Sequence, residues 1–291
     1  IRDSGTTTHY SSPIQVGSLT NWKQVAGGVR HTIAIKTDGT LWAWGSNIYG
    51  QLGAAGASFS SPIQVGSLTN WKQVACGGMS TAAIKTDGTL WTWGYNATGA
   101  LGNGTTTNYS SPIQVGSMTN WKQVAGTGIH IAAIKTDGTL WTCGYNLQGQ
   151  LGNGTIVYYS SPIQVGSLTN WKQVACGYYH TTAIMTDGTL WTWGYNNYGQ
   201  LGNSTTVNYS SPIQVGALTN WKQVACGYYY TAAIKIDGTL WTWGRNQYGQ
   251  LGNGNITNYS SPIQVGSLTN WKQVAGCSNY TAAISAPDLP A

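Results

Sequence analysis

Residues that usually perform catalysis are scarce in this chain of 291 residues. It holds four His, seven Asp and no Glu, and general acid–base catalysis draws mainly on these residue types. Five of the Asp residues begin a recurring Asp-Gly-Thr-Leu-Trp motif, where each carboxylate is expected to hydrogen-bond to its own turn. No glycine-rich phosphate loop leads into a helix pattern. The sequence predicts no catalytic residue and a protein that is not an enzyme.

The five cysteines point to packing rather than to chemistry. An odd count excludes a complete disulfide framework. Cys76, Cys176 and Cys226 share one repeat position beside a Gly, which is typical of a small buried residue. No set of ligands has the spacing of a metal site. We therefore expect neither a metal nor another cofactor.

The positive charges recur with the repeat. The formal net charge is +6, and six lysines share one motif, Asn-Trp-Lys-Gln-Val-Ala: Lys23, Lys72, Lys122, Lys172, Lys222 and Lys272. Symmetry would place them in a ring, and we interpret them as solvated lysines on separate strands. Nucleic-acid affinity requires clustered charge, so no nucleic-acid partner is predicted. No run approaches the 18 or so apolar residues of a membrane-spanning helix, so no membrane insertion is predicted.

The repeats determine the expected architecture. The string SSPIQVG begins at Ser11, Ser60, Ser110, Ser160, Ser210 and Ser260, a period of 49 or 50 residues. The 15 Trp residues fall at only three repeat positions, which is typical of packing residues because Trp buries a large area. A period of this length is the mark of a repeat architecture.

One repeat unit reads as four short strands. We predict strands at Pro13–Val16, Trp22–Ala26, Thr32–Ile35 and Leu41–Trp44, because Asp-Gly between two β-rich runs favours a hairpin. Four strands in each of about six units indicate an all-β fold, a single β-propeller domain over residues 1–291. Ile1–Gly5 align with the segment that follows a fourth strand, so we expect a strand upstream of Ile1 in a longer parent protein to pair with the C-terminal blade and close the ring. If nothing precedes Ile1, the last blade is expected to have three strands or the ring to close imperfectly.

The repeats resemble a known family. The segments VACGYYHTTAI at 174–184 and DGTLWTWGYNNYGQLG at 187–202 are similar to the unit of the regulator of chromosome condensation repeat family. The resemblance implies a β-propeller, of seven blades in the founding members. Its conserved His, here His31, His130 and His180, is replaced by Ser80, Tyr230 and Tyr280. In the family pattern this His looks structural and bonded within the blade. The best-known family activity is nucleotide exchange on a small GTPase, while other members look like lectins, inhibitors or scaffolds.

Two of the four connections in each unit vary in sequence. Alternate connections of an antiparallel blade emerge on opposite faces, so the two variable connections share one face and the two constant ones share the other. Tyr combines a rigid apolar ring with a polar tip and is enriched in binding surfaces. We predict a partner-binding surface lined by Tyr178, Tyr179, Tyr195, Tyr198, Tyr228, Tyr229, Tyr230, Arg245 and Tyr248. Neutral drift of exposed loops is the alternative.

These observations favour a non-catalytic binding or structural module whose Tyr-rich face meets a protein partner or a neighbouring subunit. A carbohydrate-binding propeller is the alternative hypothesis, and a GTPase exchange factor is the third. The low content of charged residues, 7%, with abundant Thr, Asn and Ser, suits an extracellular, cell-surface or virion setting.

Overall fold

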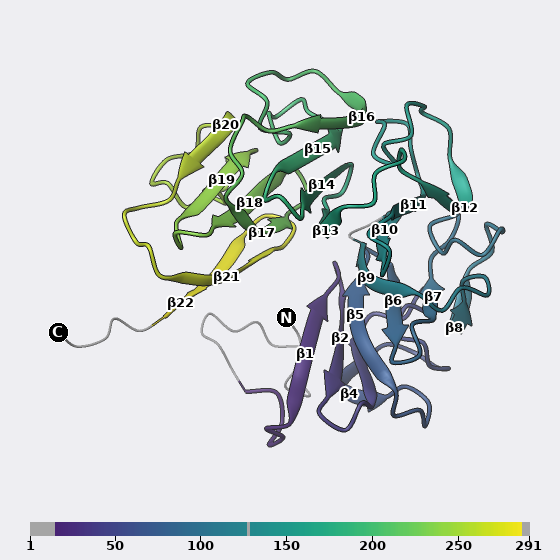
Figure 1. Cartoon of the computed structure of the whole chain (residues 1–291). Helices are drawn as coiled ribbons and strands as arrows, with labels where there is room; N and C mark the ends of the chain where they lie inside the picture. The colour runs from purple at the N-terminus through teal and green to yellow at the C-terminus, as the bar shows by residue number, and fades with distance from the viewer. Residues whose placement is uncertain (1–14, 127–128, 287–291) are drawn as a thin grey trace.

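The computed structural model describes residues 15–126 and 129–286, and every regular element in this part of the chain is a β-strand. The strands form antiparallel sheets that follow one another around an arc, from β1 at the purple end to β22 at the yellow end (Figure 1). Five sheets have four strands and a sixth has two. The predicted β-propeller is confirmed, and its last blade is incomplete, with two described strands where three were expected.

The blades have the following bounds. Blade 1 contains β1 (Trp22–Gly27), β2 (His31–Lys36), β3 (Leu41–Gly45) and β4 (Phe59–Gln64). Blade 2 contains β5 (Trp71–Cys76), β6 (Ser80–Lys85), β7 (Leu90–Gly94) and β8 (Tyr109–Gln114). Blade 3 contains β9 (Trp121–Gly126), β10 (His130–Lys135), β11 (Leu140–Gly144) and β12 (Tyr159–Gln164). Blade 4 contains β13 (Trp171–Cys176), β14 (His180–Met185), β15 (Leu190–Gly194) and β16 (Tyr209–Gln214). Blade 5 contains β17 (Trp221–Cys226), β18 (Tyr230–Lys235), β19 (Leu240–Gly244) and β20 (Tyr259–Gln264), and blade 6 contains β21 (Trp271–Gly276) and β22 (Thr281–Ser285).

The grouping of strands into blades differs from the predicted unit. The SSPIQ strand was expected to be the first strand of the unit that it opens. Instead each described copy, such as β4, pairs with the LWxWG strand that precedes it and forms the outermost strand of that earlier blade. Its Pro suits this edge position because Pro donates no ladder hydrogen bond. Half of the predicted strand Pro13–Val16, and all of Ile1–Gly5, lie outside the described residues, and Gln15 and Val16 are not in a strand.

The DGTLW motif forms a hydrogen-bonded hairpin. Asp38 Oδ1 accepts hydrogen bonds from the backbone N and the hydroxyl of Thr40, at 2.9 and 2.7 Å. Thr40 Oγ1 in turn accepts one from Trp42 Nε1 at 2.9 Å. The same three bonds recur at Asp87, Asp137, Asp187 and Asp237. The predicted structural role of these carboxylates is confirmed, and the bonds hold the pKa of Asp38 below its usual value.

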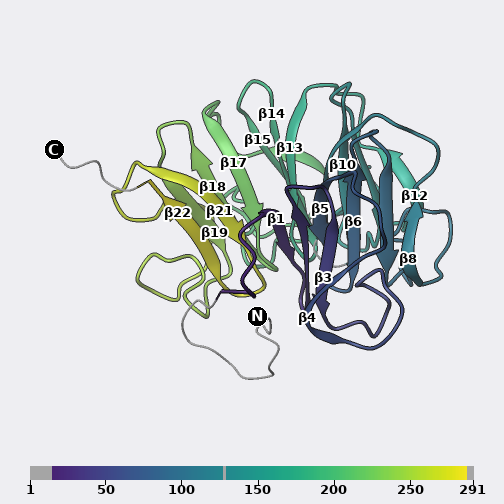
Figure 2. The same cartoon turned by 90° about the horizontal axis from the view of Figure 1, so that it is seen from below.

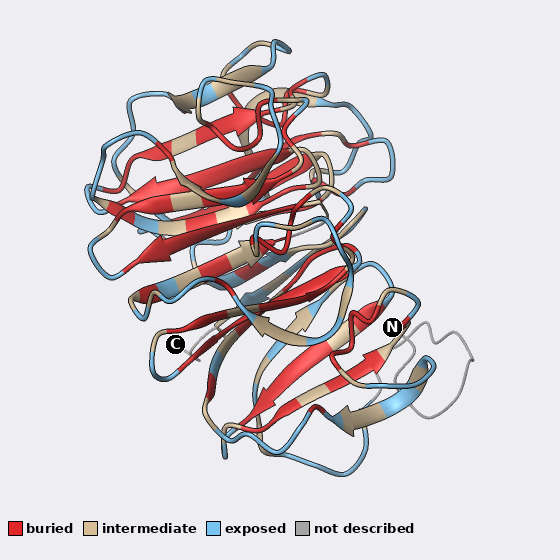
Figure 3. Cartoon of the chain, turned by 90° about the vertical axis from the view of Figure 1, so that its right-hand side faces the viewer, coloured by how far each residue is buried: buried red, intermediate tan, exposed pale blue. Residues whose placement is uncertain are grey.

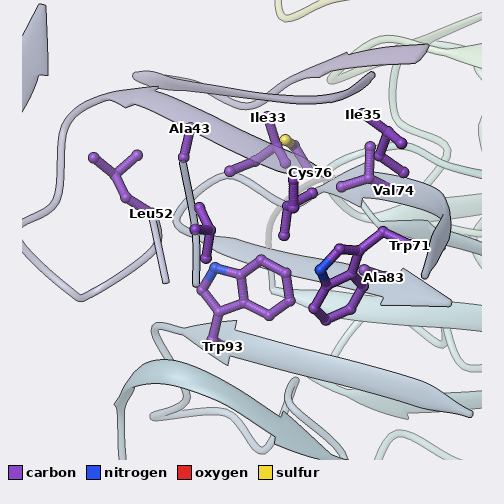
Figure 4. Close-up of a cluster of buried hydrophobic side chains, with 11 residues drawn as sticks. Ile33, Ile35, Ala43, Leu52, Trp71, Val74, Cys76, Ala83 and Trp93 are labelled. Atoms are coloured by element: carbon purple, nitrogen blue, oxygen red, sulfur yellow. The ribbon is translucent and has the colours of Figure 1, made fainter. Parts of the chain in front are cut away.

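The core lies between blades. Trp71, Val74 and Cys76 of β5 pack against Ile33, Ile35, Leu41 and Leu52 of blade 1, and Trp93 joins the same cluster (Figure 4). The rings of Trp71 and Trp93 lie 6.0 Å apart, within the range of favourable aromatic pairs. Cys76, Cys176 and Cys226 are buried, as predicted. Burial raises the pKa of the Cys76 thiol to about 12, so it is inert at neutral pH.

The innermost strands are joined by side-chain clasps. Gln123 of β9 donates from Nε2 to Val174 O of β13 at 3.1 Å, and its Oε1 accepts from Val174 N at 3.1 Å. The amide of Gln123 thus bonds to the backbone of Val174 as a neighbouring strand would, and links the two blades. Equivalent clasps join Gln24 to Val74, Gln73 to Val124, Gln173 to Val224 and Gln223 to Val274. This accounts for the repeated Gln of NWKQVA.

The family His also links blades. Nε2 of His180 lies 3.1 Å from Thr231 Oγ1 in the next blade, and His31 and His130 make the same contact. The prediction that this His bonds within its own blade is therefore wrong, although its structural role holds. Ser80 stands at the His position of blade 2, and the facing residue is Ile131 rather than Thr. The Ser80 and Ile131 pair has no imidazole to make this contact, whereas Tyr230 of blade 5 replaces the His while the facing residue, Thr281, is still Thr.

The two ends of the arc leave side chains uncovered. Val25 of β1 is 65% exposed, while its counterparts Val74 to Val274 are at most 3% exposed. Ile284 of β22 is 62% exposed, while its counterparts in the five complete blades are fully buried. In Figure 1, β1 and β22 border the opening of the arc.

Loops project from two opposite faces of the disc (Figure 2), and the buried strands run between them (Figure 3). The variable face carries the connections from the first to the second strand (28–30, 77–79, 177–179, 227–229, 277–280) and from the third to the fourth strand (46–58, 95–108, 145–158, 195–208, 245–258). The uniform face carries the hairpins (37–40, 86–89, 136–139, 186–189, 236–239) and the links to the next blade (65–70, 115–120, 165–170, 215–220, 265–270).

Candidate partner-binding face

In blades 1, 2, 4, 5 and 6 the first loop is a tight turn between the first and second strands. In blade 4, Gly177 N donates to His180 O at 2.8 Å, which leaves Tyr178 and Tyr179 at the tip. Adjacent tips are bonded to each other, since Tyr178 N donates to Tyr228 O at 3.1 Å. Val29 N and Tyr228 N donate in the same way to Gly78 O and Ser278 O, so the described loop tips of blades 1 and 2, and those of blades 4, 5 and 6, are joined by backbone hydrogen bonds.

The second variable loop of each blade is held by one asparagine. Asn196 donates from Nδ2 to Thr205 O and Val207 O, both at 3.0 Å, and its Oδ1 accepts from Leu201 N at 2.9 Å. Asn47, Asn96, Asn146 and Asn246 organise their loops in the same way. Tyr195 N also donates to Tyr179 O at 2.9 Å, which brings the two variable loops of blade 4 together.

Eight tyrosines of blades 3, 4 and 5 form one continuous patch of ring contacts, here called the tyrosine cluster. Ring centroids lie 4.6 Å apart for Tyr178 and Tyr179, 4.8 Å for Tyr178 and Tyr228, and 5.4 Å for Tyr198 and Tyr229. All of these pairs are tilted or edge-to-face, the arrangements that aromatic rings prefer. The members are Tyr145, Tyr158, Tyr178, Tyr179, Tyr195, Tyr198, Tyr228 and Tyr229.

Arg245 extends the tyrosine cluster with a positive charge. Its guanidinium carbon lies 5.2 Å from the ring centroid of Tyr198, 5.5 Å from that of Tyr229 and 5.4 Å from that of Tyr248. These distances are within cation–π range. Its Nε atom is buried without a hydrogen-bond partner. The guanidinium therefore lies among three tyrosine rings at the border of the tyrosine cluster.

Burial raises the pKa values of tyrosine hydroxyls in the cluster above their ordinary value. It raises the pKa of Tyr179 to about 12, and the neighbouring tyrosines add to the shift. It also raises the pKa of Tyr228 to about 12, which Arg30 of blade 1 partly offsets from across the mouth. Tyr179 and Tyr228 therefore present hydroxyl donors and no negative charge at neutral pH. No Asp or Glu lies on the variable face within residues 15–126 and 129–286.

Tyr230 does not belong to this surface, and its inclusion among the predicted partner-binding residues is wrong. It is fully buried, with its hydroxyl donating to Tyr280 O and accepting from Cys277 N at 3.3 Å. Tyr230 is the first residue of β18 and occupies the His position of the repeat. Its side chain therefore points between blades, as His180 does.

The other eight predicted residues come together. Tyr178, Tyr179, Tyr195, Tyr198, Tyr228 and Tyr229 lie in the tyrosine cluster, and Arg245 and Tyr248 adjoin it. Sequence reasoning missed Tyr145, Tyr158 and Arg30. Tyr145 and Arg30 lie in the same variable positions as predicted residues, and that equivalence was a usable signal. Tyr158 lies 13 residues along the same loop as Tyr145, and only folding brings their rings to 4.8 Å.

The described residues offer little else that resembles a reactive site. Across them, no group of three or more His, Cys, Asp or Glu is placed to hold a metal ion. Burial lowers the pKa of His130 and of His180 to about 3, so these imidazoles are neutral at physiological pH. No helix of the described chain has the length and apolar character needed to cross a membrane.

Comparison with known proteins identifies the family. The family model of the RCC1-like domain matches residues 3–288. Human WBSCR16 is similar at 24% identity and a TM-score of 0.83, over 95% of this chain and 75% of that protein's chain. Yeast RCC1 (Prp20), whose structure was solved bound to Kap60, is similar at 22% identity and a TM-score of 0.80, over 91% and 68% of the two chains. No curated protein sequence matches this chain. With nearly the whole chain covered by the family match and the propeller fold shared, this chain belongs to the RCC1-like domain family.

Proposed function

We propose that this propeller is a non-catalytic module that binds a protein partner through the tyrosine cluster and Arg245. The observation that carries the proposal is the local concentration of aromatic rings on one face of an otherwise near-identical set of blades. Blades 3 to 5 supply all eight rings, whereas the equivalent loop tip of blade 2 is Gly78-Met79. Drift of exposed loops alone would be expected to produce small polar residues.

The tyrosine cluster has the properties of a rigid binding surface. Its members are mostly half-buried, and they pack against one another on loops tied together by backbone hydrogen bonds. Little side-chain freedom is left to lose when a partner binds, and such preorganisation strengthens association. Tyr and Arg are also the residues that most often dominate binding energy at protein interfaces.

The charge of this face indicates the chemistry of the partner. Arg245 and Arg30 are its charged side chains within the described residues, and both are positive. A carboxylate of the partner would pair with the guanidinium of Arg245, which three rings already shield from water. The partner is therefore a polypeptide that places an Asp or Glu beside apolar or aromatic side chains.

The relatives are consistent with protein binding. The structure of yeast Prp20 was solved in complex with Kap60, and a second Prp20 structure was described together with its binding to Gsp1p and histones. The identity of 22% means that these partners support a class of function and not a particular partner.

A peptide selection tests the proposal. A random peptide library displayed on phage is selected against the immobilised full chain, and the enriched peptides are synthesised and titrated by fluorescence anisotropy. We expect peptides that contain an acidic residue next to aromatic ones. We expect Tyr179→Ser/Tyr229→Ser to weaken their binding about 10-fold or more, and Arg245→Gln to weaken it about 10-fold.

Matched variants separate this site from the rest of the surface. Tyr109→Ser/Tyr209→Ser removes two tyrosines at the start of outermost strands, outside the tyrosine cluster, and should bind the peptides as the parent chain does. Equal losses in both double variants would contradict the proposal. A glycan array probed with the same proteins addresses the carbohydrate alternative: sugar binding that depends on Tyr179 and Tyr229, without peptide binding, would replace a protein partner by a glycan.

A further inference from the structure

The uniform face repeats one pair of side chains in every blade. Each link to the next blade ends in Leu-Thr-Asn or Met-Thr-Asn, followed by Trp and an exposed Lys. Five of the six apolar residues are 44–47% exposed: Leu19, Leu68, Leu168, Leu218 and Leu268. Met118 takes the sixth place and is half-buried. The exposed lysines are Lys23, Lys72, Lys122, Lys172, Lys222 and Lys272.

Backbone contacts hold these pairs at one height around the ring. Trp171 N at the start of β13 donates to Gly138 O in the hairpin of the preceding blade, at 3.1 Å. The same bond recurs at the other four described interfaces, between 3.0 and 3.2 Å. Gly138 also lies so close to Thr169 O that an added Cβ would overlap it. Each apolar residue lies two residues before this Asn-Trp step and each Lys directly after it, so the six pairs recur at equivalent positions of the uniform face.

The charge of the uniform face is strongly positive. All ten described lysines and all five described aspartates are on it, a net charge of +5. Four of the lysines are buried against tryptophan rings, as Lys85 is with its Nζ 3.6 Å from the centroid of Trp91. These four lie close to the hairpin aspartates and offset most of their charge. The six exposed lysines therefore carry nearly all of the net positive charge outward.

We infer that the uniform face docks on an anionic lipid surface. A bilayer is flat and presents the same chemistry at all six positions, so every blade can contact it at once. Half-exposed Leu side chains can enter the headgroup region while the neighbouring lysines attract anionic lipids, the two terms that set peripheral membrane affinity. A duplex nucleic acid or an asymmetric protein would meet only some of the six equal positions. A second copy of this face would be repelled by its like charge.

Vesicle co-sedimentation of the full chain tests the inference. The vesicles are phosphatidylcholine alone or phosphatidylcholine with about 30% phosphatidylserine, at about 0.1 M salt. We expect binding to the anionic vesicles only. Lys122→Gln should weaken it about 5-fold, and Lys122→Gln/Lys172→Gln about 25-fold, since each lysine near an anionic surface contributes roughly that factor. Leu168→Ser/Leu218→Ser should weaken it about 3- to 10-fold.

The opposite face supplies the matched control. Arg30→Gln removes the same charge as Lys122→Gln but on the variable face, so vesicle binding should stay within about 2-fold of the parent chain. The inference is overturned if the parent chain sediments equally with neutral vesicles or with neither kind. It is also overturned if Arg30→Gln weakens vesicle binding as much as Lys122→Gln does, or if the lysines promote binding of duplex DNA but not of vesicles. Peptide binding by the tyrosine cluster is measured separately, so either proposal can fail alone.

Discussion

The two faces of this disc differ in how far their side chains serve the fold. On the uniform face, each hairpin carries the same Asp–Thr–Trp hydrogen bonds, and each glycine turn lies against the next link. On the variable face, the frame is equally regular, with one Asn and one bonded loop tip in each described loop pair, but the tips themselves change from Gly-Met to Tyr-Tyr. The difference shows that the hydrogen-bonded frame is the same in the described blades on both faces, whereas the frame does not determine which side chains stand at the tips of the variable face.

The largest expected loss of unfolding free energy comes from lowering the pH, because the buried histidines beneath the variable loops resist protonation in the folded chain. Burial lowers the pKa of His31 to about 4 and those of His130 and His180 to about 3. An unfolded His titrates near 6.5, so the unfolded chain binds protons more readily. Stability is therefore full above about pH 6.5 and is lost as pH falls toward the folded pKa values. At pH 5 each His should lower the free energy of unfolding by about 2 kcal/mol.

Urea unfolding between pH 7.5 and 5 measures this loss. The window stays above the range where the aspartates titrate, because hydrogen bonds hold their pKa values below the usual one. The variant His180→Ser/Thr231→Ile copies the natural Ser80 and Ile131 pair of blade 2 and should lose about a third of the acid sensitivity. Stability that is flat across this window would show that the histidines are not buried in the folded chain.

The next effect concerns the glycines of the uniform face. Gly138 has a φ of +78°, and a Cβ there would overlap Thr169 O. Gly138→Ala should cost about 3 kcal/mol or more of unfolding free energy. Gly116, on a link of the same face, has a φ of +60° and open space around it, so Gly116→Ala should cost only about 1 kcal/mol. Equal losses of unfolding free energy in the two variants would mean that the close approach of the hairpin to the link between blades does not contribute to stability.

A smaller loss of unfolding free energy is expected when a glutamine clasp between neighbouring blades is removed. Gln123→Ala removes two hydrogen bonds to Val174 and should cost about 1–2 kcal/mol. Gln273 has the same repeat position but is exposed, and within the described chain it makes no clasp. Gln273→Ala should therefore cost less than about 0.5 kcal/mol. Differential scanning calorimetry of the two variants separates them, and identical melting temperatures would contradict the clasp.

Much of this architecture was predictable from the spacing of motifs. Asp-Gly turns and the segregation of Trp gave the strands and the propeller, because hairpin chemistry is local and Trp positions report packing. The assignment of the SSPIQ strand was wrong because a repeat has no inherent starting point, and the ladder with β3, β7 or β11 forms only in the folded sheet.

The predicted surface residues that lie in variable loops were placed correctly, whereas the one at the start of a strand was not. Tyr228 and Tyr229 stand on a turn, but Tyr230 starts β18 and alternates inward. Because Tyr228, Tyr229 and Tyr230 are identical residues in a row, the sequence alone does not show that the third side chain turns inward. The position of Tyr230, which is that of the repeat His, does indicate it. Contacts between Tyr145 of blade 3 and Tyr179 of blade 4 depend on how neighbouring blades pack, which no local pattern encodes.

The most direct test of the account exchanges loop tips within the protein itself. Replacing Tyr178-Tyr179 and Tyr228-Tyr229 by the Gly-Met tip of blade 2 keeps a loop that this fold already accepts. If the tyrosine cluster is a binding surface, the exchanged chain should remain folded, losing about 2–4 kcal/mol of unfolding free energy with its ring contacts, while its affinity for the selected acidic–aromatic peptides falls about 100-fold. Unchanged peptide affinity would contradict a binding role for the tyrosine cluster, and loss of the folded state would show that the tyrosines serve the scaffold instead.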